Sequence, residues 1–237
     1  PEDPVTPPLH TVYRYRPRTE GRFARIDKWE NNATKELHWR ATTKDNVTSI
    51  YGRTPAARIA DPEDEQRVYE WLLEETFDDK DNHILYEYAR DNPQLYNKEN
   101  RSLHLNKIYD QNRNASQLYI RRIYYGNLPN PLLDEHGSPV KYPNGSEIGH
   151  FRDGLRYAFE VVFDYGDWAI PTKDPHPDPL PVGQQELFGP DPSIYAANNA
   201  VPIRQDPFSS FRARFEIRTL RRCRRALMFH HFAELKS

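Results

Sequence analysis

The stretch Val68–Arg90, VYEWLLEETFDDKDNHILYEYAR, decides how the rest of the chain is interpreted. Two arms rich in aromatic and aliphatic residues flank a polar connector, Asp-Asp-Lys-Asp-Asn. Read as strands, the arms place large side chains on alternate positions: Tyr69, Trp71, Leu73 and Phe77 in the first, Ile84, Tyr86 and Tyr88 in the second. Alternation with a period of two around a turn-rich connector predicts a β-hairpin. We take this hairpin as the building unit of a structural piece of a larger assembly, rather than of an enzyme.

A helix competes with a strand for the first arm. The preceding acidic stretch, residues 61–64, reads Asp-Pro-Glu-Asp, which is typical of a helix N-terminus. A helix would place Val68, Trp71, Leu72 and Glu75 on one stripe. We favour the strand for this arm, and the second arm, Ile84–Tyr88, is the clearer strand of the two.

Similar alternation predicts further strands along the chain. They are Thr11–Arg16, Leu37–Thr43, Val47–Tyr51, Leu118–Tyr125, Tyr157–Tyr165, Phe211–Ile217 and Ala226–Phe232. The continuous apolar run of Tyr157–Tyr165 indicates the middle of a sheet, whereas Phe23–Trp29 is ambiguous in period. Residues 1–10 read as an extended lead-in. Residues 53–66 read as a loop, and the segments 92–117, 128–155 and 171–205 as long loop insertions, the last rich in proline.

Composition limits the function classes. The chain has 237 residues and a net charge of -2, so no global field favours nucleic acid or an anionic membrane. Its 15 tyrosines, 11 phenylalanines and 4 tryptophans argue against disorder. A single cysteine, Cys223, excludes an internal disulfide. The only methionine is Met228, which indicates a segment cut from a longer protein.

The tripeptide Lys-Asp-Asn occurs at residues 44–46 and again at 80–82, each time between two β-prone arms. The spacing of 36 residues suggests an internal repeat. Asp and Asn are also common turn residues, so coincidence is an equally good interpretation.

Residues that could carry chemistry have simpler structural interpretations. Adjacent residues of a strand point to opposite faces, so Glu74 and Glu75 cannot share an acid–base site. His230 and His231, together with His38 or Cys223, could suggest a metal site. The same strand geometry argues against it, because the side chains of His230 and His231 would point to opposite faces. The segment Arg204–Arg225 holds eight arginines, which could bind a phosphate or nucleic acid but which alternate as on a polar strand face.

Five ordered blocks of the sequence together resemble a known family. They are RPRTEGRFARIDKW (16–29), HWRATTKDNVTSIYG (38–52), EWLLEETFDDKDNHILYEY (70–88), FEVVFDYGD (159–167) and DPFSSFRARFEIRTLRRCRRALMFHHF (206–232). These blocks are similar to the SpvB-like N-terminal region of the B component of Tc insecticidal toxin complexes. Asp79–Tyr88 is similar to a YD unit with Asp81 in place of the usual turn glycine, and Arg214 stands where a small residue such as glycine is expected.

The resemblance implies a fold and a role. In that family the B and C components build a hollow Rhs/YD-repeat β-shell around a cytotoxic segment, and a propeller in other parts of the B component docks on the pentameric A component. Some relatives end in an ADP-ribosyltransferase marked by an Arg, a Ser-Thr-Ser strand and an ExE turn. Glu63–Glu65 fits the last pattern trivially, no Ser-Thr-Ser occurs, and Ser209-Ser210 follows in the wrong order.

We therefore expect a mainly β fold of consecutive antiparallel hairpins forming a curved sheet, with residues 1–237 as one SpvB-like shell segment. We expect no enzyme activity and no catalytic, cofactor-binding or metal-binding residues. The expected partners are the remainder of the B-component chain, the C component and, through other domains, the A component, without nucleic acid or direct membrane contact. The expected location is extracellular, within a secreted toxin complex. The alternative is a stand-alone carbohydrate- or protein-binding β domain that uses residues such as Trp168 or Tyr195.

Overall fold

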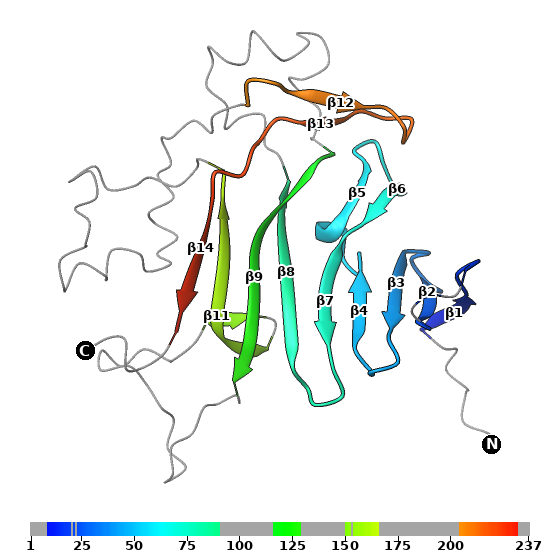
Figure 1. Cartoon of the computed structure of the whole chain (residues 1–237). Helices are drawn as coiled ribbons and strands as arrows, with labels where there is room; N and C mark the ends of the chain where they lie inside the picture. Colours follow the sequence, from blue (N-terminus) through cyan, green and yellow to red (C-terminus); the bar gives the residue numbers. More distant parts are fainter. Residues whose placement is uncertain are drawn as a thin grey trace, which may run out of the picture.

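A computed structural model describes residues 9–19, 21, 23–90, 116–128, 150–152, 154–165 and 204–231. The regular structure of these residues is almost entirely β-strand (Figure 1), and a single 3-10 turn, η1 (Pro55–Ala57), is the only helical element among them. The strands are β1 (His10–Tyr15), β2 (Arg25–Asn31), β3 (Leu37–Thr42), β4 (Thr48–Tyr51), β5 (Arg58–Asp61), β6 (Asp64–Trp71), β7 (Leu73–Phe77), β8 (His83–Arg90), β9 (Leu118–Leu128), β10 (His150–Arg152), β11 (Leu155–Asp164), β12 (Phe208–Ser210), β13 (Ile217–Thr219) and β14 (Arg225–His230).

Ten strands form one antiparallel sheet that does not close on itself. Its order is β1-β2-β3-β4-β7-β8-β9-β11-β10, and β14 also pairs with β11. Most neighbours in the sheet are also neighbours in the chain, as expected for consecutive hairpins. Figure 1 shows the sheet turning from the broad face of β8 and β9 to β1 and β2, which are seen nearly edge-on. The predicted mainly β fold of antiparallel hairpins is confirmed.

The opening hairpin is confirmed only in its inner part. β7 pairs with β8, with Thr76 opposite Ile84, but the first arm breaks at Leu72. There the Leu72 N–H donates to Ala57 O (2.8 Å) and Leu72 O accepts from the Gly52 N–H (2.8 Å). Because both bonds tie this residue to the chain before β5, β6 leaves the large sheet. It pairs instead with β5 in a second, two-stranded sheet.

One prediction for this region is wrong, and the choice of a strand over a helix for the first arm is confirmed. The segment 53–66, predicted as a loop, contains η1, all of β5 and the start of β6. The helix considered for the first arm does not form, because residues 64–71 are a strand paired with β5. The Asp61 side chain instead accepts a hydrogen bond from the Glu63 N–H (3.0 Å), which holds a tight turn between two strands.

The two Lys-Asp-Asn tripeptides do not occupy equivalent positions. In the β3–β4 turn the Asn46 N–H donates to Thr43 O, and Asn46 has φ 58°. In the β7–β8 turn the Asp81 N–H donates to Asp78 O, and Asp81 has φ 64°. The left-handed residue is thus third in the first tripeptide and second in the other. The same type of turn recurs, but the sequence match that suggested a 36-residue repeat is out of structural register.

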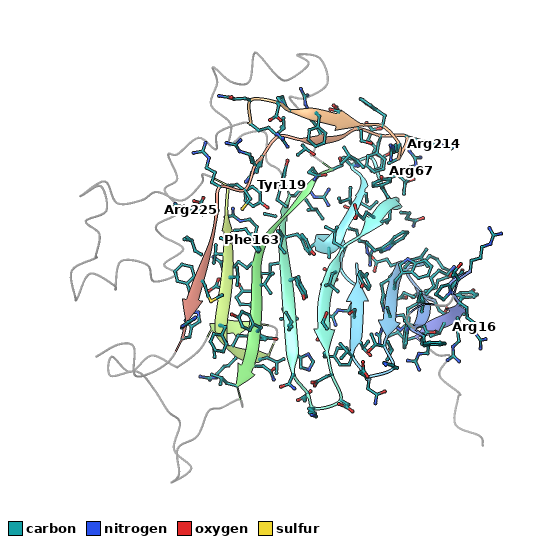
Figure 2. All side chains as sticks on the ribbon, viewed as in Figure 1. Arg16, Arg67, Tyr119, Phe163, Arg214 and Arg225 are labelled. Carbon is teal, nitrogen blue, oxygen red and sulfur yellow. The ribbon has the colours of Figure 1, made fainter. Side chains whose placement is uncertain are left out.

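The predicted strand Phe211–Ile217 is also wrong. β12 ends at Ser210 and β13 begins at Ile217, and the Arg214 N–H donates to Phe211 O (3.0 Å) inside the connecting turn. Arg214 has φ 68°, so its left-handed backbone interrupts any strand, and this is the position where the family resemblance leads us to expect glycine. Figure 2 shows Arg214 at the tip of this hairpin, which crosses the end of the sheet.

Hydrogen bonds dock this C-terminal hairpin on the sheet. The Tyr119 hydroxyl of β9 accepts from the N–H groups of Leu220 (2.9 Å) and Arg221 (3.2 Å), and Ser116 Oγ donates to Glu216 O (2.6 Å). Ile217 packs with Ile59 and Leu118 in a small buried cluster. This cluster joins β5 and β13, which belong to the two small sheets, to β9 of the large sheet.

The predicted central strand is confirmed. β11 lies between β9 and β14, and its alternate residues Glu160, Val162 and Asp164 are fully buried. The predicted loop 128–155 contains the short strand β10, which turns back onto the start of β11. Most of the lead-in 1–10 and of the insertions 92–117 and 171–205 lies outside the described residues.

Candidate functional site

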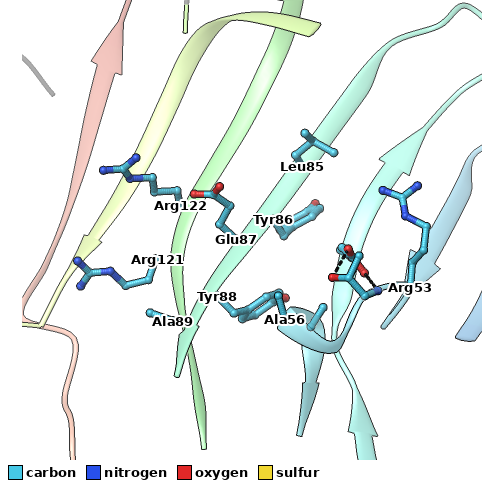
Figure 3. Close-up of a pocket in the computed structure, with 12 residues that line it drawn as sticks. Arg53, Ala56, Leu85, Tyr86, Glu87, Tyr88, Ala89, Arg121 and Arg122 are labelled. Carbon is cyan, nitrogen blue, oxygen red and sulfur yellow. Dashed lines mark hydrogen bonds between the residues drawn. The ribbon is translucent and has the colours of Figure 1, made fainter. Parts of the chain in front are cut away.

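An open groove of about 400 Å³ lies beside β8. Figure 3 shows Tyr86 and Tyr88 pointing toward the side of Arg53, while Arg121 and Arg122 extend away from them over the neighbouring strand. The full lining is Arg53, Thr54, Ala56, Ala57, Glu74, Leu85, Tyr86, Glu87, Tyr88, Ala89, Arg121 and Arg122. Its walls are therefore mixed in charge, with two tyrosine rings between them.

The side of the groove near β7 is held by two carboxylates that point in different directions. Glu75 receives Arg53 Nη1 at 2.6 Å and lies 2.8 Å from His83 Nδ1. Glu74 instead accepts from both the N–H (2.9 Å) and the Oγ1 hydroxyl (2.8 Å) of Thr54. The prediction that the adjacent glutamates cannot share an acid–base site is consistent with this arrangement, in which each carboxylate fixes a different structural contact.

His83 bridges two carboxylates at the end of this hairpin. Burial alone lowers the pKa of His83, but hydrogen bonds from its ring to Asp81 (3.0 Å) and Glu75 (2.8 Å) outweigh burial and raise the pKa above its ordinary value. The ring also stacks on Phe77 with a centroid distance of 5.4 Å. The ring thus links Glu75 of β7 to Asp81 of the β7–β8 turn.

β11 carries buried carboxylates on the sheet face that also holds Glu75. Glu160 has no exposed surface and lies 3.2 Å from Arg122 Nε and 3.4 Å from His231 Nε2. Asp164 receives Arg225 Nε at 2.6 Å. Cross-strand pairing places Arg122 and Glu160 on one face, so the ion pairs run from β9 through β11 to β14. These contacts orient strands rather than a substrate.

A second cluster lies at the N-terminal end of the same face. The rings of Trp29 and His38 stack at 5.8 Å, His10 meets both edge-on, and the Arg40 guanidinium lies 3.8 Å from the Trp29 ring centre. Burial, together with the nearby charge of Arg40, lowers the pKa of His38 to about 4. His38 is therefore neutral at pH 7 and accepts a hydrogen bond from Arg40 Nε (3.2 Å).

The residues considered for a metal site are far apart in the sheet. His38 lies in β3 and His230 in β14, with β4, β7, β8, β9 and β11 between the two strands. Cys223 is an exposed free thiol. Within the described ranges, no three His, Cys, Asp or Glu residues group closely enough to hold a metal ion.

The arginine-rich segment does not form one continuous row. Arg204 makes two 2.9 Å hydrogen bonds to Asp206, and Arg225 is engaged by Asp164. Arg221 is buried with its guanidinium 5.6 Å from the Tyr119 ring centre. These three arginines thus have three different local surroundings, and two of them, Arg221 and Arg225, contact strands of the large sheet.

Sequence reasoning missed Glu160 and its partner Arg122 as organising residues. Glu160 is the single charge inside an otherwise apolar run, FEVVF, and that contrast was the available signal. Arg53 gave no such signal, since its role depends on a turn that brings it across to Glu75. The described part of the chain contains no helix that could span a membrane.

The sequence of this chain is similar to a known family and to several characterised proteins. The family described as Salmonella virulence plasmid 65kDa B protein matches residues 2–232. The mono(ADP-ribosyl)transferase SpvB of Salmonella typhimurium is 32% identical over 228 residues, which cover 96% of this chain and 33% of that protein. SpvB of Salmonella choleraesuis gives the same identity and coverage. The chain thus spans about a third of the length of these relatives.

Solved structures give the same assignment. The N-terminal domain of effector protein SpvB from Salmonella typhimurium has a TM-score of 0.67 at 28% identity, over 95% of this chain and 60% of that one. The Photorhabdus luminescens Tc holotoxin pore matches with a TM-score of 0.67 at 28% identity, over 96% of this chain and 9% of that one. The TcdB2-TccC3 complex matches with a TM-score of 0.66 at 28% identity, over 95% and 9% of the respective chains. The chain belongs to the SpvB family, and its fold is one that this family shares with components of Tc toxin complexes.

Proposed function

We propose that the chain is a wall segment of a toxin-complex B component, in which it helps to build a hollow β-shell around a cytotoxic cargo. The observation that supports this most strongly is the long open sheet without a covering layer of helices among the described residues. A globular domain normally buries a sheet against a second layer around one core. Here the buried apolar clusters are small, as in Ile59, Leu118 and Ile217, or Leu85, Tyr124 and Tyr157.

The ionic network fits a wall better than a binding site. Removing one partner of a buried ion pair is costly, so the contacts of Glu160 and Asp164 fix the relative positions of β9, β11 and β14. A wall needs such fixed strand positions over a large area, whereas a catalytic site needs a few groups left available for substrate. Residues 1–237 act, in this proposal, as one structural segment without enzyme activity, cofactor or metal.

The wider setting follows from the same proposal. Its partners are the rest of the B-component chain and the C component, and the pentameric A component is reached through other domains. It acts in a secreted, extracellular toxin complex and contributes to virulence without contacting nucleic acid or membrane. In this proposal, the transferase activity in the name of the SpvB relatives belongs to parts of those proteins outside the third that this chain matches.

The test is protease protection of the cargo in the assembled complex. Val162 is fully buried in β11, so Val162→Asp is expected to disrupt the wall and make the enclosed cargo digestible. Met228→Asp changes a side chain that is 61% exposed on the adjacent β14 and is the matched control that should leave protection intact. Cargo that stays protected in the Val162→Asp complex would show that this segment is not part of the wall.

The groove beside β8 supports a second candidate, a carbohydrate- or protein-binding β domain. Tyrosine rings between charged groups are suited to sugar or peptide contacts. Glycan-array binding by the chain, lost on Tyr86→Ala, would favour this function over the wall. Trp168 and Tyr195, considered above for the same role, lie outside the described residues.

A further inference from the structure

The first strand of the sheet has one partner among the described residues. β1 pairs with β2 along its whole length, from His10 opposite Asn31 to Tyr15 opposite Ile26, and it ends the strand order. Figure 2 shows Arg16 projecting at this edge of the molecule. Unpaired strand edges present backbone N–H and C=O groups that can template a further strand.

The hydrogen-bond pattern identifies which residues face outward. Asn32 N–H donates to Leu9 O (3.0 Å), which makes this pair a hydrogen-bonded one. Such pairs alternate along an antiparallel ladder, so Thr11, Tyr13 and Tyr15 direct their backbone groups at β2. The backbone groups of His10, Val12 and Arg14 therefore point away from the sheet.

A second bond checks this assignment independently. Asn31 N–H donates to Glu36 O (2.9 Å), so Asn31 directs its backbone at β3. The even-numbered residues of β2, which alternate with it, must then face β1. Both bonds therefore indicate that three alternate residues of β1, His10, Val12 and Arg14, direct six backbone N–H and C=O groups away from the sheet.

The side chains around this edge are exposed and basic. Val12, Tyr13 and Tyr15 are 45%, 43% and 44% exposed. The charged residues of the edge and of β2 are Arg14, Arg16, Arg18, Arg25 and Lys28 against Asp27 and Glu30. Asp27 is buried and already lies 2.9 Å from Arg25 Nε, whereas Arg14 reaches it only at 3.5 Å and keeps 65% of its side chain exposed. The edge therefore has a net positive field.

We propose that the β1 edge accepts a further antiparallel strand with acidic side chains at alternate positions, supplied by another polypeptide segment of the shell. This inference rests on the proposed wall function. The neighbouring strands are all antiparallel, which sets the expected direction. Acidic side chains would meet Arg14 on one face, and apolar ones would cover Tyr13 and Tyr15 on the other. A second copy of this chain fits less well, because two β1 edges would bring like charges together.

The first measurement is amide hydrogen exchange of the whole chain by NMR. The amides of Val12 and Arg14 should exchange much faster than those of Tyr13 and Tyr15, because only the latter bond to β2. Outward amides as protected as the inward ones would mean that the chain covers this edge itself, and would overturn the proposal.

The second measurement adds a strand-forming peptide, acetyl-TEVEVET-amide, with acetyl-TKVKVKT-amide as its charge-reversed control. The acidic peptide should protect Val12 and Arg14, and the basic peptide should bind at least about tenfold more weakly at low salt. Equal binding of the two peptides would contradict the proposal of an acidic partner strand. Protection of the Val12 and Arg14 amides that rises with protein concentration in the absence of peptide would contradict it as well. The latter result would indicate self-association.

Val12→Pro tests the backbone pairing directly. Proline is tolerated on an edge strand where its missing N–H faces solvent, so the chain should stay folded while peptide binding is lost. Val12→Thr keeps the N–H and should bind the peptide as the unchanged chain does. Binding that survives Val12→Pro would rule out strand addition at β1. Because cargo protection is not measured here, failure of this edge and failure of the wall function give separate results.

Discussion

Single residues with left-handed backbones shape the turns of this sheet. Lys35, Asn46, Asp81 and Arg214 all have positive φ, between 58° and 68°. Asn and Asp tolerate this region because their short side chains bond nearby backbone, whereas a long side chain gains nothing there. Lys35 and Arg214 are therefore the strained members of the set, and Arg214 has the larger φ. Sequence similarity located this position, but alternation of Phe, Ala and Ile around it gave the wrong secondary structure.

Replacing Arg214 by glycine should stabilise the chain. Glycine removes the cost of a side chain in the left-handed region, which outweighs its greater freedom when unfolded, so we expect a gain of about 0.5–1 kcal/mol. Thermal or urea unfolding measures this change. Arg212→Gly, in the same exposed turn but without a positive φ, is the matched control and should destabilise. A loss of stability for Arg214→Gly as large as for Arg212→Gly would contradict the strain argument.

His38 should make stability depend on pH in the acid range. Its pKa is about 4 when folded and near 6.5 when unfolded, so protons bind the unfolded chain first. The chain should lose about 2–3 kcal/mol as the pH falls from 6.5 to 4. His83 works in the opposite direction, since its raised pKa adds stability below pH 6.5 that is lost as the pH rises through that raised value.

Unfolding of the His38→Gln variant over this pH range isolates the effect. Glutamine can still accept the Arg40 hydrogen bond but does not titrate, so the variant should lose less stability between pH 6.5 and 4 than the unchanged chain. His83→Gln is the control and should change the pH dependence with the opposite sign. Parallel pH profiles for the His38→Gln variant and the unchanged chain would refute the buried neutral histidine.

At the level of elements, strand existence followed from the sequence and strand partnership did not. Alternation located β1, β3, β4, β8, β9, β11 and β14 because each pairs with a neighbour and shows two different faces. It failed at Leu72, where hydrogen bonds to Ala57 and Gly52 divide one alternating run between two sheets. Such a break depends on backbone groups far along the chain, which no local pattern reports.

Only the local geometry of the candidate site could be predicted from the sequence. Period-two geometry separated Glu74 from Glu75, and their different partners agree with it. The groove and the ion pair of Glu160 with Arg122 require four strands, β7, β8, β9 and β11, to be in register, because their residues come from distant positions. Charge compensation across strands is a tertiary property, so the sequence showed the charges but not their pairing.

β9 depends on a glycine that makes room for an aromatic ring. Gly126 has φ 66°, and a β-carbon there would lie 2.6 Å from Phe159 Cδ2. The Phe159 ring is also stacked on Tyr125 at 4.9 Å, so it has little freedom to move. Gly126→Ala should destabilise the chain by about 2–3 kcal/mol, through combined backbone strain and overpacking.

Urea unfolding of Gly126→Ala can be compared with Gly21→Ala. No atom lies within 4 Å of a β-carbon at Gly21, and its φ is not in the left-handed region, so this control should change stability little. Equal effects of the two substitutions would show that the close approach of Phe159 is not required for the β9–β11 pairing.

At the scale of the whole molecule, most strands of the described residues form one large sheet whose two faces differ in character. One face carries the buried ion pairs of Glu75, Glu160 and Asp164. The other carries half-exposed aromatic residues, including Tyr15 against Trp39 and Tyr125 against Phe159. Water-exposed aromatic surface and an open strand edge are both unfavourable for a free monomer. A place inside a larger β-shell would remove both.

The chain expressed alone should therefore be poorly soluble or oligomeric, and should become monodisperse when joined to the remainder of a B component. Light scattering and sedimentation measure both states at matched concentration. Val12→Pro separates the two causes of association, because it blocks the β1 edge and leaves the aromatic face unchanged. If the open edge dominates, this variant should be largely monomeric, and if the aromatic face dominates, it should associate as before. A monodisperse monomer of the unchanged chain that melts cooperatively would count against the wall function, because such a chain would need no neighbouring strands.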